Sequence, residues 1–214
     1  MPRPSDRTQR DLGSSAEELT SGPPPSGAAA SVYLPPFRVD VTVRPGVALP
    51  ISRAALARAM AAALEAGGAP RPASIGLILS DDGELAELNA AHMGMPGPTD
   101  VLSFPMLPPE AYPPHAGRDR AHLDQAATAA AVFPLPPGVR VHVGDVVVSV
   151  GRARLQAGAG RGGQTGEVRW SAADELRLLV THGTLHVCGW DHAEHVEEAA
   201  MRSLERELLR AGWT

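Results

Sequence analysis

Residues 141–150 read VHVGDVVVSV, an apolar run rich in β-branched valine. β-Branched side chains pack well on a pleated surface, so this run is predicted to be a central strand. Working outward from it, the other segments predicted to be strands are 37–43, where apolar and polar residues alternate, 74–79 and 101–104. The segments predicted to be helices are 53–66, 83–92, 172–188 and 194–210. Interleaved strands and helices of this kind predict an α/β or α+β domain over about residues 37–214.

Capping residues mark where two of these helices begin and end. Ser52 can cap the helix over 53–66, and Gly67 stops it. Ser171, followed three residues later by Asp174, predicts a capped start for the helix over 172–188, and Gly189 ends that helix.

Proline marks two segments outside the predicted fold. Residues 1–36 hold seven prolines and too little apolar content to offset chain entropy, so they are predicted to be a disordered tail. Residues 105–138 hold eight prolines, and about 106–139 is predicted to be a long Pro/Ala-rich loop or insertion, with a short helix near 119–131.

Composition excludes several classes of protein. The 214 residues include 19 basic residues, all of them arginine, against 24 acidic ones, and a net charge of −5 argues against a bulk nucleic-acid coat. No run of about eighteen uncharged apolar residues occurs, so no transmembrane helix is expected. One cysteine excludes an internal disulfide. The N-terminus lacks the apolar core of a secretory signal, and we expect a cytoplasmic protein.

Three of the eight histidines are spaced as metal ligands. His182 and His186 stand four apart on a predicted helix, so their rings project from one face. Gly189 lets the chain turn back, which can bring His192 to the same ion. Three imidazoles with a fourth position open to water describe a catalytic zinc site, with one zinc per chain.

The other candidate ligands fit this pattern less well. Cys188 is two positions from His186 and points to the opposite side of the helix, and His195 falls within the next predicted helix. The remaining histidines show no comparable spacing and are predicted to be surface or loop residues: His92, His115, His122 and His142.

The spacing H-x₃-H-x₂-G-x₂-H also matches the metzincin zinc proteases. Those enzymes place a glutamate directly after the first histidine as general base. Here that position is Gly183, so peptide hydrolysis by that mechanism lacks its proton acceptor.

Residues 182–192, HGTLHVCGWDH, resemble the HGxLHLxGxDH signature of the YbeY family, whose members are bacterial endoribonucleases of ribosomal RNA maturation. Two further blocks agree in order and approximate spacing. Leu88-Asn89, Gly94 and residues 98–105, PTDVLSFP, resemble the family's LN…RGKxxPTDVLSFP segment, and residues 144–147, GDVV, resemble its GD[LI]-type strand. The resemblance covers about residues 37–214.

The resemblance implies a single α+β domain with a small mixed sheet packed with helices, whose C-terminal helices hold zinc through His182, His186 and His192. It implies hydrolysis of single-stranded RNA by a metal-activated water, with no residue as nucleophile. The implied process is 3′-end processing of small-subunit ribosomal RNA and ribosome quality control, with that RNA and the small subunit as partners.

Two other functions remain open at this point. One is a non-catalytic ribosome-biogenesis factor with a structural zinc, and the other is a zinc hydrolase of another substrate. Neither the oligomeric state nor the cleavage site follows from the sequence.

Contacts to RNA phosphate require cations. Residues 140–170 carry five arginines against two acids, and Arg152 and Arg154 are the candidate substrate contacts. The family typically has an arginine directly before the glycine at Gly94, where it is thought to act on the substrate phosphate, and this chain has Met93 there. Because methionine is uncharged, the sequence predicts weakened cleavage with zinc binding intact.

Overall fold

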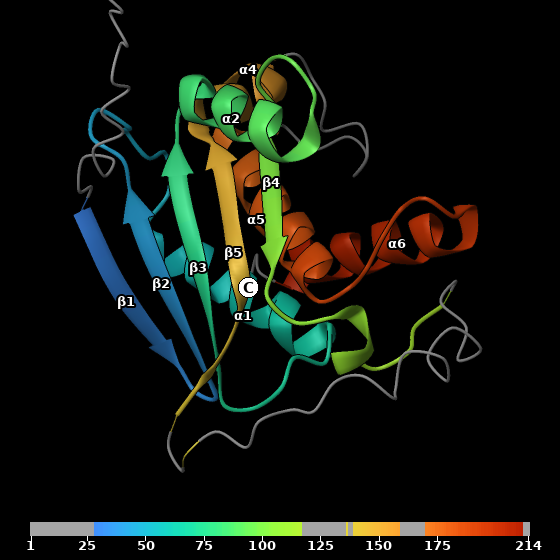
Figure 1. Cartoon of the computed structure of the whole chain (residues 1–214). Coiled ribbons are helices and arrows are strands. Elements are labelled where there is room, and N and C mark those ends of the chain that lie inside the picture. The colour runs from blue at the N-terminus through green and yellow to red at the C-terminus, as the bar shows by residue number, and fades with distance from the viewer. Residues whose placement is uncertain (1–27, 117–135, 137–138, 159–169, 212–214) are drawn as a thin grey trace, which may run out of the picture.

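A computed structural model describes residues 28–116, 136, 139–158 and 170–211 (Figure 1). Five strands form one mixed sheet in the order β1-β2-β3-β5-β4. Their bounds are β1 Ala28–Leu34, β2 Phe37–Val43, β3 Ala73–Ser80, β4 Val101–Pro105 and β5 Val141–Ser149. The three central strands run parallel, and β1 and β4 pair antiparallel at the two edges. The prediction of a small mixed sheet in an α+β domain is confirmed.

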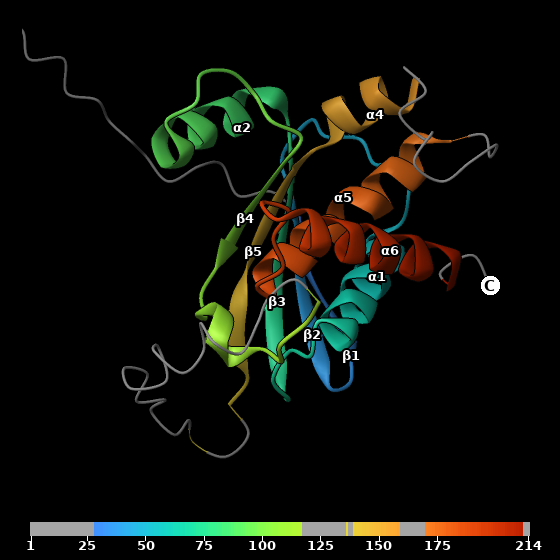
Figure 2. The same ribbon diagram turned by 90° about the vertical axis from the view of Figure 1, so that its right-hand side faces the viewer.

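The helices cover the two faces of the sheet unequally. Their bounds are α1 Arg53–Ala66, α2 Asp82–Leu88, α4 Val150–Gly158, α5 Ala172–Val187 and α6 His195–Ala211. Turned by 90°, the molecule shows α1, α5 and α6 on one side of the sheet and α2 on the other (Figure 2). None of the helices in the described part of the chain is long and apolar enough to cross a membrane.

The core lies between the sheet and the helices α1 and α5. In β2 the buried side chains alternate with half-buried ones, whereas β3 and β5 are buried on both faces and read as near-continuous apolar runs. A smaller cluster on the opposite face joins Leu85 of α2 to Leu102 and Val147. Both faces of the central strands are therefore covered, which explains why apolar and polar residues do not alternate along β5.

The predicted caps are present. The Ser52 side chain accepts a hydrogen bond from the backbone N–H of Ala55 at the start of α1. Ser171 and Asp174 form a reciprocal capping box at the start of α5. The capping box fixes the first turn of α5, the helix that carries two of the predicted metal ligands.

Strand β1 corrects the prediction for the N-terminal segment. The predicted disordered tail covered residues 1–36, but residues 28–34 pair with β2 at all seven positions. Val32 and Leu34 pack against the core, while the remaining β1 side chains that the structure describes are exposed. An edge strand is stabilised largely by backbone pairing, which composition does not reveal. The prediction for residues 1–27 lies outside the described residues.

Two further differences from the predicted elements concern helices. Helix α4 was not predicted, and it begins directly after β5, where the Ser149 hydroxyl accepts a hydrogen bond from the N–H of Arg152. The helix predicted over 83–92 is α2 followed by one wider π-helical turn, η1, at Asn89–Met93.

The predicted loop over 106–139 is described only in part. Residues 106–116 contain one short 3₁₀ turn, η2, at Pro109–Ala111, with Tyr112 buried after it. The short helix predicted near 119–131 lies outside the described residues.

Candidate metal centre

Helix α5 packs closely against β4 and β5 at Gly183. A Cβ atom at this position would lie 2.6 Å from Val146 Cγ1 and 3.1 Å from Ser103 Oγ. The Ser103 hydroxyl donates a hydrogen bond to the Gly183 carbonyl at 3.0 Å. This side of the helix therefore faces the sheet and has no room for the glutamate that metzincins carry after the first histidine.

The structure brings the three predicted histidines together. One ring nitrogen from each of His182, His186 and His192 lies within 4.8 Å of the others. Gly189, with φ of 83°, allows the chain to leave α5 and return toward it with His192. The Nε2 atoms of His182 and His186 are 3.1 Å apart. Two nitrogens bound at about 2.05 Å to a tetrahedral zinc would be about 3.3 Å apart, so the pair fits this ion.

The Nδ1 atoms of the first two histidines have partners of their own. His182 Nδ1 lies 2.6 Å from Glu205 Oε1, and His186 Nδ1 lies 2.8 Å from the carbonyl oxygen of Trp190. An imidazole that donates its Nδ1–H to such an acceptor keeps the Nε2 lone pair for a metal ion. Both rings are thus held in the orientation and the tautomer that a metal ligand requires.

Burial also favours the neutral form of His186. It lowers the pKa of this histidine to about 4, and the nearby His182 contributes to the same direction. A ligand imidazole must be neutral to bind a metal ion, so His186 needs no deprotonation at neutral pH.

A pocket of about 250 Å³ lies beside His182 and His192. Its polar lining includes the side chains of Asp100, Arg202 and Glu205. Arg202 forms an ion pair with Glu198, which also lines the pocket, at 2.6 Å. Carboxylates therefore outnumber cations around the histidines, and this charge favours a bound cation.

Comparison with known proteins shows the family. The family model described as "Endoribonuclease YbeY" matches residues 49–212. An "Endoribonuclease YbeY" of Dehalococcoides mccartyi strain 195 is 34% identical over 179 residues, covering 79% of this chain and 92% of its own. A relative of the same name from Thermobifida fusca is 38% identical over 175 residues, covering 82% and 93%. The chain belongs to the YbeY family.

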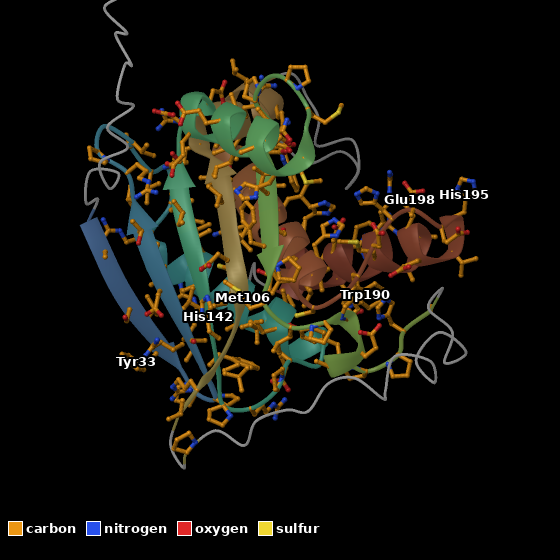
Figure 3. The ribbon with its side chains drawn as sticks, viewed as in Figure 1. Tyr33, Met106, His142, Trp190, His195 and Glu198 are labelled. Atoms are coloured by element: carbon orange, nitrogen blue, oxygen red, sulfur yellow. The ribbon has the colours of Figure 1, made fainter. Side chains whose placement is uncertain are left out.

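In the described part of this YbeY-family chain, the metal-ligand candidates set aside above do not belong to the cluster formed by the three histidines. Cys188 is fully buried, and burial raises the pKa of its thiol to about 12, which disfavours the thiolate a metal would need. His195 is fully exposed and points away from the body of the molecule (Figure 3). His92 and His142 are exposed, as predicted, and His122 lies outside the described residues.

The two arginines predicted to contact substrate make other contacts. Both belong to α4. Arg152 lies 3.6 Å from an oxygen of Asp82, and Arg154 donates to the carbonyl oxygen of Ala48 at 2.7 Å. Neither lines the pocket beside the histidines, where Arg202 supplies the cation instead.

Sequence reasoning missed three residues around the histidines. Glu205 and Glu197 belong to α6, and their carboxylates contact His182 and His115 respectively. His115, predicted to be a surface or loop residue, is in a loop, but its side chain is only 9% exposed. These pairs are 23 and 82 residues apart in sequence, so no local pattern could have indicated them.

Proposed function

We propose that this chain is a zinc-dependent endoribonuclease that cleaves single-stranded RNA. The proposed process is 3′-end maturation of small-subunit ribosomal RNA and ribosome quality control, with that RNA and the small subunit as partners. One zinc per chain would be held by His182, His186 and His192.

One observation carries this proposal. The Nε2 atoms of His182 and His186 face each other at 3.1 Å while both Nδ1 atoms are engaged by protein acceptors. Such an arrangement removes water from the two ring nitrogens, which is unfavourable, and a cation between the nitrogens would stabilise it. Membership of a family whose relatives are named endoribonucleases supports RNA as the substrate.

In this proposal, different residues orient the ligands and contact the phosphodiester. Glu205 and the Trp190 carbonyl orient two ligands, and the exposed His192 closes the third side while leaving the site open to solvent. A zinc ion held there would supply a water activated at neutral pH and positive charge for a phosphoryl oxygen. Arg202 stands at the same pocket as a cation for the phosphodiester.

We further propose that cleavage is weaker than in relatives that carry an arginine before the glycine. Met93, which occupies this position, is the last residue of η1 and is 63% exposed. It offers neither charge nor a hydrogen-bond donor to a phosphate. The neighbouring His92 packs edge-on against Phe104, with ring centroids 5.2 Å apart.

The test uses the full chain, its His186→Ala variant and the matched control His195→Ala. We expect about one zinc per chain, measured by mass spectrometry of the metal, in the wild type and in the control. His186→Ala should lose most of the zinc and the cleavage of a single-stranded RNA carrying a 3′-extended small-subunit end, while duplex RNA stays intact throughout.

Each alternative function has its own outcome in this experiment. Zinc without RNA cleavage in the wild type would indicate a non-catalytic factor with a structural metal. Zinc-dependent hydrolysis of a peptide or a small ester, with RNA untouched, would indicate another substrate. Full zinc retention in His186→Ala would contradict the proposed ligands.

A further inference from the structure

The segment that follows β4 is anchored against the helices. Tyr112 is buried within the main core, although it belongs to the predicted loop. Pro113 packs on the turn after α1, where a Cβ atom at Gly68 would lie 2.5 Å from Pro113 Cγ. These two contacts hold Tyr112 in the core and Pro113 beside the C-terminal end of α1.

His115 extends from this anchored segment into two contacts. Its Nε2 atom lies 2.7 Å from Glu197 Oε1, and the two side chains are only 9% and 8% exposed. Its ring stacks on the ring of Trp190, with centroids 3.9 Å apart and planes at 11°. Figure 3 shows Trp190 between α6 and the segment after β4.

Both partners of His115 hold the turn that carries the third histidine. The carbonyl oxygen of Trp190 accepts from His186 Nδ1 at 2.8 Å. The backbone N–H of Asp191 donates to Glu197 Oε1 at 2.8 Å, and this is the oxygen that His115 also contacts. The next residue in the chain is His192, so one network of contacts links His115 to the backbone beside two metal-ligand candidates.

We propose that His115 is a positioning residue of the metal centre, which fixes the turn 190–192 and thereby the third ligand. This inference rests on the proposed zinc site. Two ligands are held by a helix, but His192 is exposed and lies on a turn, so its ordering must come from neighbouring contacts. A turn ordered before the metal arrives loses less conformational entropy on binding, and metal affinity rises accordingly.

Two variants separate the contacts of His115, and a third serves as control. His115→Ala removes both contacts, while His115→Phe keeps a ring on Trp190 and loses the bond to Glu197. The matched control, His142→Ala, also loses a histidine–carboxylate contact, the 3.3 Å one to Asp145, on an exposed part of β5.

The first readout is zinc affinity by competition with a chromogenic chelator. We expect affinity to fall about 10-fold or more in His115→Ala, as is typical for groups that support metal ligands, and less in His115→Phe. The control should keep the wild-type value. A purely structural role in a still-folded domain would lower the melting temperature without this loss of affinity.

The second readout is hydrogen exchange in the metal-free protein, which does not depend on zinc. The amides of 190–192 should exchange faster in His115→Ala, while the amides of β3 keep their wild-type rates. If His115→Ala does not fold, His115→Phe is compared with wild type in the same way.

The two proposals can fail separately. If the wild type binds no zinc, the proposed function fails, and faster exchange at 190–192 in His115→Ala then shows only that His115 orders this turn. Unchanged exchange at 190–192 in the variants overturns that role, and so does wild-type zinc affinity in His115→Ala.

Discussion

Replacing Gly183 by alanine tests how closely α5 packs on the sheet. Alanine is the better helix former, and in an open helical position the change stabilises by up to about 1 kcal/mol. At Gly183, however, the new Cβ would lie 2.6 Å from Val146 Cγ1, closer than carbon atoms pack. Val146 is fully buried and stiff at χ1 because it is β-branched, so it has no inexpensive way to move aside.

The two effects can be weighed against each other. Overpacking a well-packed core costs about 1–3 kcal/mol, which exceeds the helix-propensity gain. We therefore expect Gly183→Ala to lower the free energy of unfolding by about 1–2 kcal/mol at the sheet–helix contact. For a chain of this size that corresponds to a melting temperature lower by about 2–8 °C.

Gly151 in α4 provides the matched control. A Cβ atom there would meet nothing closer than Ser149 Oγ at 3.7 Å, which is ordinary contact. Thermal and urea unfolding of both variants should show Gly151→Ala at or above wild-type stability and Gly183→Ala below it. If Gly183→Ala is as stable as Gly151→Ala, α5 does not approach the sheet as described, and the steric argument against a glutamate at this position falls with it.

Three further predictions concern the metal site, the ion pair between Arg44 and Glu84, and Met93. Glu205→Ala should weaken zinc binding about 10- to 100-fold, because it removes the acceptor that orients the first proposed ligand. Glu207→Ala, at an exposed position of the same helix, should bind zinc as the wild type does. Equal zinc affinities of the two variants in a chelator titration would refute this. The Arg44 guanidinium lowers the pKa of Glu84 from its ordinary value of 4.5. The ion pair therefore adds to the free energy of unfolding above pH 4.5, and this contribution is lost as the pH falls through the lower pKa of the folded state. Glu84→Gln should therefore be less stable than wild type by about 1 kcal/mol at pH 7, and urea titrations should show this difference shrinking as the pH falls below the ordinary pKa of a glutamate. Met93→Arg should raise RNA cleavage by up to about 10²-fold without changing zinc content, and an unchanged or lower rate would show that this position is not the missing phosphate contact.

The features that sequence reasoning predicted are those with local signals. The i, i+4 spacing of His182 and His186 fixes their shared face once the helix is known, and Gly189 marks the turn. The capping box at Ser171 and the valine-rich run of β5 depend only on neighbouring residues. Each of these features could be predicted because its signal depends only on residues that are close together in the sequence.

The features that it missed depend on contacts between distant segments. Strand β1 forms because its backbone pairs with β2, and its side-chain pattern is weak. Helix α4 buries only Val150 and Ala153, too few for a clear helical period. The contact between Arg154 and the Ala48 carbonyl is a further example, because it joins residues 106 positions apart, and the role of Arg154 toward substrate stays a prediction.

The metal centre combines both kinds of information. Its signature residues lie within eleven positions of one another, and a helix alone sets the geometry of His182 and His186. Glu205 of α6 contacts the ring of His182, and in our proposal Glu197 of α6 and His115 of the segment after β4 set the place of the proposed third ligand. Two chains with the same signature can therefore differ in metal affinity through residues outside it. The position of His115 shows where such a difference would arise in this chain, because the contact that orders the turn at 190–192 comes from a segment whose composition indicates only a loop.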